Sequence, residues 1–143
     1  MYTFNNWMQL VGDNQDNQLE GSNGDDTITG GAGNDTLTGN AGNDILNGGV
    51  GDDSINGGDG NDTAVFSDVA NQVDLGISIS QNTGDGNDTL TSIENINGGG
   101  GDDTLTGNSD NNILRGEEGS DTLYGNGGND ILNGGSGADD MRG

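Results

Sequence analysis

Aspartate is the residue whose spacing in this sequence points to chemistry. The 143 residues include 25 acidic side chains, of which 21 are Asp and only 4 are Glu. An acidic tail that only solvates a protein has no reason to avoid Glu, which is the better helix former. Five aspartates follow one another at intervals of nine residues: Asp26, Asp35, Asp44, Asp53 and Asp62. A fixed spacing and a short side chain indicate carboxylates that are held in place to bind a ligand.

The residues that are missing exclude several classes of function. The chain has no His, no Cys and no Lys, and Arg115 and Arg142 are its only basic residues. This removes the common zinc, haem and iron–sulfur ligands, Cys or Ser–His nucleophiles, disulfides and phosphate-binding lysines. With a net charge of -23, neither a nucleic acid nor an anionic membrane surface is expected as a partner. No catalytic constellation remains, so we expect no enzyme activity.

The chain is built from a nine-residue repeat in two arrays. Six blocks run in register from Gly12 to Val65, and five more from Gly98 to Arg142. Position 1 is always Gly, and position 6 is Asp in nine of the eleven blocks, with Asn17 and Asn112 as exceptions. Glycine adopts positive φ at little cost, so positions 1 to 6 predict a tight turn. Positions 7 to 9 alternate polar, apolar, polar and predict a three-residue strand with one side chain pointing inward.

The expected core is the column of apolar residues at position 8. One such side chain for every nine residues is too little apolar burial to offset the entropy of ordering the chain. The predicted core residues are Leu19, Ile28, Leu37, Leu46, Ile55, Ala64, Leu105, Leu114, Leu123, Leu132 and Met141.

These blocks resemble the RTX nonapeptide GGxGxDxUx of hemolysin-type calcium-binding proteins, in which U is a large apolar residue. The resemblance implies an all-β fold, a right-handed parallel β-roll with two repeats in each coil and calcium ions between the turns of successive coils. It covers nearly all of the chain outside residues 1–11 and 66–82. It also implies that the module helps an attached effector to be secreted and to fold.

Coil stacking explains physically why a cation is needed. Strand spacing of about 4.8 Å brings like-charged carboxylates together, and a divalent cation between them reverses the repulsion. Calcium accepts six to eight oxygen ligands, including backbone carbonyls, whereas magnesium demands a strict octahedron. With two repeats per coil, five pairs of carboxylates face each other: Asp26 with Asp44, Asp35 with Asp53, Asp44 with Asp62, Asp103 with Asp121, and Asp121 with Asp139.

The expected cofactor is therefore Ca²⁺, with about five or more ions for each chain. Asn17 with Asp35 and Asn112 with Asp130 lack one charge and should bind weakly or not at all. The aspartates at position 5 (Asp25, Asp52 and Asp102) are expected to face solvent. The predicted metal ligands are Asp26, Asp35, Asp44, Asp53, Asp62, Asp88, Asp103, Asp121, Asp130 and Asp139.

The sequence divides into four segments. Residues 1–11, with Tyr2, Phe4 and Trp7, are expected to cap the open end of the roll. Residues 12–65 and 98–143 are the two arrays. Residues 66–97 are an irregular segment that joins them, in which Val73 to Ile79 predict a longer strand and Thr83–Thr91 form an isolated repeat with Asp88 at position 6. A continuous solenoid is favoured, and a floppy linker between two rolls is the alternative.

The functional hypothesis is a calcium-binding repeat module that folds on calcium binding outside the cell, as part of a type I secreted protein and as a monomer. The start of the chain lacks the features of a signal peptide, and the expected C-terminal secretion signal is missing, which suggests a fragment or a degenerate gene product. One alternative is the non-catalytic C-terminal module of a secreted hydrolase or toxin. Another is an adhesive or ice-binding solenoid, which would need a continuous row of threonines along one face. The Thr-x-Thr strands of this sequence form only an interrupted row.

Overall fold

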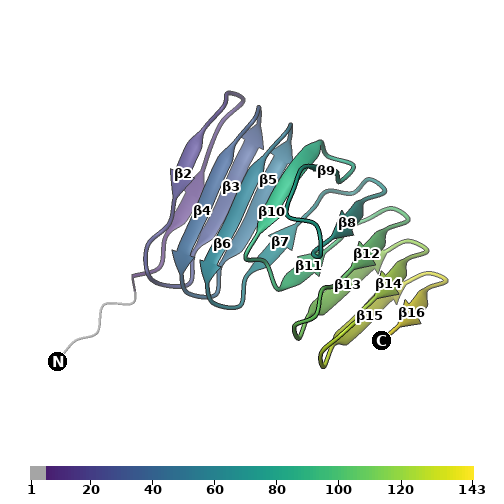
Figure 1. Cartoon of the computed structure of the whole chain (residues 1–143). Helices are drawn as coiled ribbons and strands as arrows, with labels where there is room; N and C mark the ends of the chain where they lie inside the picture. Colours follow the sequence, from purple (N-terminus) through teal and green to yellow (C-terminus); the bar gives the residue numbers. More distant parts are fainter. Residues whose placement is uncertain (1–5) are drawn as a thin grey trace.

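The computed structural model describes residues 6–143, which form a stack of β-strands without a helix. The strands stack from β2 near one end to β16 at the other, broadly in chain order except that β10 follows β6 and lies before β8 (Figure 1). No segment of residues 6–143 is a helix that could cross a membrane.

One face of the stack is a single seven-stranded parallel sheet in the order β1-β3-β5-β7-β11-β13-β15. Partners lie two repeats apart along the chain, as in Thr27 opposite Ile45 and Ile28 opposite Leu46. This offset of two repeats per coil confirms the predicted all-β parallel β-roll. The strands are β1 (Gln9–Val11), β3 (Thr27–Ala32), β5 (Ile45–Val50), β7 (Thr63–Val65), β11 (Asn95–Asn97), β13 (Ile113–Glu118) and β15 (Ile131–Ser136).

The opposite face is divided into two sheets. The first, in the order β2-β4-β6-β10-β9, contains β2 (Gln18–Glu20), β4 (Thr36–Ala41), β6 (Ser54–Asp59), β10 (Asn87–Thr91) and β9 (Gln81–Asn82). The second, in the order β16-β14-β12-β8, contains β16 (Asp140–Arg142), β14 (Thr122–Tyr124), β12 (Thr104–Thr106) and β8 (Gln72–Asp74). All pairs are parallel except β9 with β10. The seven-stranded sheet therefore runs through both arrays, whereas the other face is interrupted between them.

The core is the column of position-8 side chains that the repeat predicts. Ile28, Leu37, Leu46, Ala64 and Leu105 have no exposed surface. The prediction fails at the last strand, where Met141 is 49% exposed because no further coil packs on β16. The irregular segment adds Phe66, Val73, Leu90, Ile93 and Ile96 to the same core.

Several strands are longer than the predicted three residues. β3, β4, β5 and β6 each have six residues and extend through position 3 of the next block. The glycine at position 1 is part of the strand, so the turn proper covers positions 4 to 6. Backbone pairing continues through position 3, where Ala32 N donates a hydrogen bond to Asp13 O, one coil away, at 3.0 Å.

The predicted long strand from Val73 to Ile79 is wrong. β8 ends at Asp74, whose Oδ1 accepts a hydrogen bond from Gly76 N at 2.8 Å and turns the chain. Ile77 and Ile79, which the predicted strand included, lie beyond its end and are both exposed, Ile79 by 73%. A turn-forming Asp and the following Gly outweigh the apolar alternation here.

The predicted cap can be examined only from residue 6 onward. Gln9–Val11 add the first strand of the seven-stranded sheet, and Leu10 packs against the core. Trp7 is 65% exposed and does not cover the end of the core. Tyr2 and Phe4 lie outside the described residues.

Candidate metal sites between the turns

The aspartates at position 6 line the turns, where successive coils meet. Eight of the ten predicted ligand residues are buried, with at most 3% of their surface exposed; Asp130 and Asp139, near the C-terminal end, are half-buried. The buried eight are Asp26, Asp35, Asp44, Asp53, Asp62, Asp88, Asp103 and Asp121. A buried carboxylate is costly unless it is paired or binds a metal, so their burial calls for a compensating partner.

One oxygen of each carboxylate has a partner in the preceding coil. Asp26 N donates to Asp44 Oδ1 at 2.7 Å, and Asp44 N donates to Asp62 Oδ1 at 2.8 Å. In the second array, Asp103 N donates to Asp121 Oδ1 at 2.9 Å. The hydrogen bonds fix each side chain at the gap between two coils and bring the predicted partners into register.

The second oxygen is buried without a hydrogen-bond partner at six of these residues: Asp35, Asp44, Asp53, Asp62, Asp103 and Asp121. Unpartnered buried oxygens of this kind are rare in folded proteins. Each has the same unsatisfied atom, Oδ2. This repetition along the stack indicates that the oxygen faces a recurrent site for a cation.

Backbone carbonyls converge on the same gaps. A Cβ atom added to Gly39 would collide with both Asp44 Oδ2 and Gly57 O, which belongs to the next coil. A Cβ on Gly30 would likewise collide with Asp35 Oδ2. Only glycine leaves room at position 1 for the two oxygens, which explains why that position is always Gly.

Burial and like charge raise the pKa of several carboxyls at the gaps. The pKa of Asp53, Asp62 and Asp103 is raised to about 6, first by desolvation and further by neighbouring carboxylates. The pKa of Asp44 is also raised, by desolvation and by Asp26 and Asp25. A cation in the gap would oppose both effects.

Two ligand positions depart from the predicted pairs. Asp88 stacks on Asp53, since Asp53 N donates to Asp88 Oδ1 at 2.8 Å, so the isolated repeat continues the first array. Glu94 occupies the corresponding place beyond Asp62, and Asp62 N donates to its Oε2 at 2.8 Å. The sequence repeat identified Asp88 but not its partner. It missed Glu94 because the residues around Glu94 do not follow the nine-residue spacing.

Asparagine replaces aspartate at three places along the edges. Asn17 and Asn112 have their Oδ1 atoms beside the glycine at position 1, where aspartates have Oδ2. These oxygens accept backbone hydrogen bonds from Asp13 N and Asn108 N. Asn71, which the repeat did not identify, lies in the coil before Asp103 and is 2% exposed.

The side chains at position 5 have a different role from those at position 6. Asp25 Oδ1 accepts a hydrogen bond from Asn43 N, and Asn43 Oδ1 accepts one from Asn61 N, at 2.8 and 2.9 Å. These residues are exposed, as the sequence predicts for Asp25. One acceptor oxygen is enough for this role, so Asn and Asp alternate freely at position 5.

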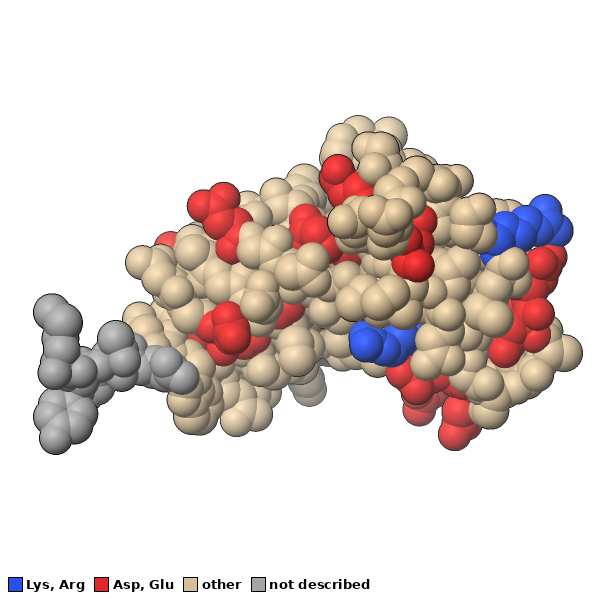
Figure 2. Space-filling model, turned by 90° about the horizontal axis from the view of Figure 1, so that it is seen from below, with Lys and Arg blue, Asp and Glu red and all other residues tan. Residues whose placement is uncertain are grey.

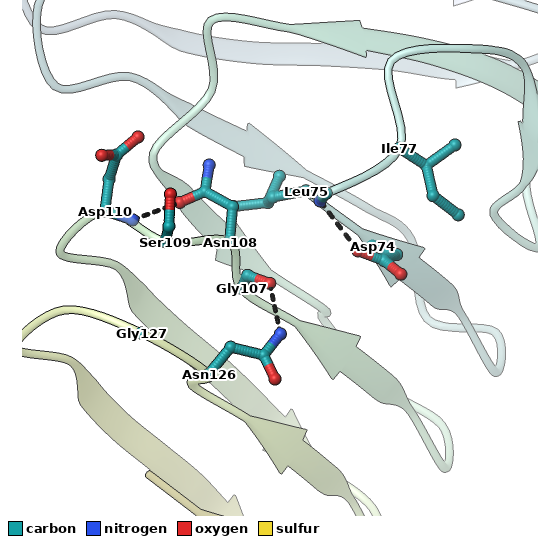
Figure 3. Close-up of a pocket in the computed structure, with 10 residues that line it drawn as sticks. Asp74, Leu75, Ile77, Gly107, Asn108, Ser109, Asp110, Asn126 and Gly127 are labelled. Atoms are coloured by element: carbon teal, nitrogen blue, oxygen red, sulfur yellow. Dashed lines mark hydrogen bonds between the residues drawn. The ribbon is translucent and has the colours of Figure 1, made fainter.

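A surface groove lies beside the turns of the second array. It has a volume of about 670 Å³ and is lined by the loop after β8 and by the turns around Asn108 and Asn126 (Figure 3). Its polar groups are used locally: Asn108 Oδ1 accepts a hydrogen bond from Asp110 N, and Asn126 Nδ2 donates to Gly107 O. The groove presents turn-stabilising groups and no paired acid and base.

Acidic side chains far outnumber basic ones along the molecule, as they do in the sequence. Figure 2 shows acidic side chains along the visible face, with few basic atoms among them. Arg142 pairs with Asp140 at 2.7 Å, and both side chains are more than half exposed. Such a pair contributes little to stability in water, so it does not compensate the acidic side chains.

The donor set at the gaps fits calcium. No group of three acidic side chains gathers within residues 6–143, so each gap offers at most two carboxylates, completed by backbone carbonyls. Calcium accepts such mixed oxygen ligands in a flexible geometry, and softer metals would require nitrogen or sulfur. The fold and these gaps define a parallel β-solenoid built around acidic sites for cations.

A family model supports this assignment. The RTX calcium-binding nonapeptide repeat matches in four copies, over residues 11–46, 29–64, 91–123 and 106–141. The chain belongs to this family and is a calcium-binding repeat module. A search of curated protein sequences finds no match.

Proposed function

We propose that calcium ions bind in the gaps between successive coils and that the module folds when they bind. The ligands are the ten aspartates at position 6, with glycine carbonyls of the adjoining coil. The observation that carries the proposal is the set of six buried Oδ2 atoms without a partner. A cation in each gap gives these oxygens a counter-charge and offsets the repulsion between facing carboxylates.

The site of action we propose is outside the cell, on a type I secreted protein with an attached effector, and as a monomer. Calcium-binding modules of extracellular proteins work at Kd values of about 10⁻⁴ to 10⁻³ M, so a weak site stays empty where calcium is scarce. A chain of net charge -23 then stays extended until the ions bind, because self-repulsion opposes compaction. The two arrays at 12–65 and 98–143, the joining segment 66–97 and the cap 1–11 remain our division of the chain.

An ice-binding role has less support. It needs an unbroken rank of threonines along one face, but the register pairs Thr27 with Ile45 and Thr29 with Asn47. The rank is interrupted after a single strand.

The test is a titration of calcium into the chelator-treated protein, monitored by far-UV circular dichroism. We expect weak β signal without metal, a cooperative gain of β structure with calcium, and little change with magnesium at the same concentration. Magnesium is the matched control because it has the same charge but keeps its waters and its octahedral geometry. An ordered roll after exhaustive dialysis against EDTA, or an equal response to magnesium, would contradict the proposal.

A further inference from the structure

The two arrays meet at a junction where a shortened turn replaces the repeat. The register places Thr91 opposite Asn56 and Asn95 opposite Thr63. Six residues connect Asn56 to Thr63, whereas only the three residues 92–94 connect Thr91 to Asn95. The junction thus contains no GGxGxD turn, yet it faces Asp62 across the gap between coils.

The shortened turn still supplies oxygens at the same place. A Cβ on Gly57 would collide with both Asp62 Oδ2 and Ser92 O. In the regular coils, the place of the Ser92 carbonyl is taken by the carbonyl of the position-1 glycine in the next coil, as it is by Gly57 O beside Gly39. Ser92 has a φ of 50°, in the left-handed region. This conformation accompanies the placement of its carbonyl at the gap.

Glu94 completes the set with a second carboxylate. Its Oε2 accepts the hydrogen bond from Asp62 N at 2.8 Å, which is the role of Asp44 Oδ1 toward Asp26. Asp62 is fully buried, its Oδ2 has no partner, and Glu94 is among the charges that raise its pKa. The extra methylene of Glu suits a turn that is three residues shorter.

We propose that Asp62, Glu94 and the Ser92 carbonyl form an additional calcium site that joins the two arrays. This inference rests on the proposed function. A groove of about 350 Å³ lined by Ser92, Glu94 and Asp110 opens beside the junction and gives an ion a path from solvent. The ion would hold the end of the first array against the start of the second.

The test counts calcium ions on the folded full-length chain by isothermal titration calorimetry and flow dialysis. We expect Glu94→Gln to bind one ion fewer than the unmodified chain. Its amide oxygen can still accept from Asp62 N, so the turn itself is preserved. The matched control is Glu118→Gln, which removes the same charge from an exposed residue of β13 and should leave the count unchanged.

The variant Asp44→Asn distinguishes a failure of the junction site from a failure of the proposed function. If Asp44→Asn lowers the count and Glu94→Gln does not, the junction site is wrong while the proposed function stands. If neither lowers the count, the proposed function itself fails. Should Glu94→Gln not fold at saturating calcium, the count is made on Glu94→Asp, which keeps the charge but has a shorter reach; an undiminished count in that variant overturns the site.

A second inference concerns Asn71 and rests on a different observation. The amide nitrogen Nδ2 lies within hydrogen-bond distance of four oxygens: Val69 O at 2.6 Å, Gly98 O at 2.9 Å, Ser67 O at 3.1 Å and Asp103 Oδ1 at 3.3 Å. Two come from its own turn and two from the next coil. An N–H₂ group has two hydrogens, so four acceptors around it form a cage of the kind that surrounds a cation.

We infer that the Nδ2 group of Asn71 takes the place of a metal ion in this gap and links β8 to the second array without calcium, while the Oδ1 of the same side chain stays buried without a hydrogen-bond partner. Asn71→Asp should then convert the gap into a metal site and raise the ion count by one. The matched control, Asn34→Asp, adds the same charge at an exposed residue of position 5 and should leave the count unchanged. The inference is wrong if Asn71→Asp binds no additional ion, if it does not fold at saturating calcium, or if Asn71→Ala loses an ion.

Discussion

Replacing Asp44 with asparagine tests the assignment of ions to gaps most directly. Asp44 contributes to two gaps, because its Oδ1 accepts from Asp26 N and its own N–H donates to Asp62 Oδ1. The substituted asparagine keeps the Oδ1 acceptor and the side-chain volume, but it replaces the unpartnered buried Oδ2 with an NH₂ group. The variant therefore removes a charge from both gaps while it preserves the backbone hydrogen bonds.

The expected loss follows from linkage. A site that binds only the folded chain stabilises it by about 2.7 kcal/mol when the ligand is at 100 times its Kd. If both gaps around Asp44 lose their ion, the calcium-dependent free energy of unfolding falls by roughly 5 kcal/mol under that condition. Asp26→Asn removes a charge from the gap with Asp44, which is the only one of its gaps with two carboxylates, so about half of that loss is expected.

The opposite effect is expected without calcium. Asp44 has a raised pKa because of desolvation and the nearby Asp26 and Asp25 carboxylates, so its charge opposes folding. Removing the charge should stabilise the calcium-free chain. The variant thus becomes less dependent on calcium and less stable at saturating calcium, a combination that simple damage to the fold does not produce.

Urea unfolding at saturating calcium, followed by circular dichroism, measures the loss of stability. The β signal of the chelator-treated variant, compared with that of the unmodified chain, measures the gain without calcium, and titration calorimetry counts the ions. Asp25→Asn is the control: it removes the same charge from an exposed residue whose Oδ1 only accepts from Asn43 N. We expect it to leave the ion count unchanged. Equal losses for the Asp44 and Asp25 variants would refute the placement of the ions, and equal losses for the Asp44 and Asp26 variants would refute the two-gap role of Asp44.

Three further predictions follow from the same geometry. In calcium-free protein, the three carboxyls with a folded pKa of about 6 bind more protons in the folded state than in the unfolded state. Their contribution to stability is therefore present below pH 4 and lost as the pH rises through 6, by about 1.4 kcal/mol for each unit of pKa shift. Far-UV circular dichroism of the chelator-treated chain at a series of pH values would detect this as a β signal that falls as the pH rises. Gly48→Ala would push a Cβ into Asp53 Oδ2 and should lower both stability and calcium affinity, whereas Gly127→Ala, whose Cβ would meet its nearest atom at an ordinary 3.4 Å, should change neither; calorimetry would compare them. Leu46→Ala should cost about 2 to 5 kcal/mol at saturating calcium because Leu46 is fully buried, while Met141→Ala, at an exposed site, should be nearly neutral in the same unfolding assay.

The nine-residue repeat predicted the features of the structure that depend on regular spacing, namely the positions of the turn aspartates and of the core leucines. Asp26, Asp35 and Asp44 lie in successive turns because each block has the same length. The offset of two blocks per coil, which the resemblance to RTX repeats implied, is the one that the strand pairs have. Leu37 and Leu46 are buried because their blocks have polar residues on both sides of one apolar position. In this part of the chain, local sequence and tertiary structure agree.

Prediction failed where the path of the chain depends on its neighbours. Glu94 cannot be recognised by counting nine residues, because its turn is three residues shorter than the others. Asn71 looks like an ordinary loop residue until Asp103 and Gly98 are seen beside it. The exposure of Ile79 was likewise decided by where the chain turns after Asp74, and apolar alternation does not encode the burial of Phe66 and Ile93 either.

The junction also has a consequence for cooperativity. In a solenoid each coil contacts only its neighbours, so order propagates from one coil to the next. The seven-stranded sheet passes through the junction from β7 to β11 and β13, while the other face is interrupted between β10 and β8. An unbroken strand ladder therefore crosses the junction on one face only, whereas the other face is linked by isolated hydrogen bonds such as Gln72 N to Thr83 O at 3.2 Å. If an ion at Glu94 strengthens that crossing, the two arrays fold together in one calcium transition; without it, the transition should separate into two steps, one for each array.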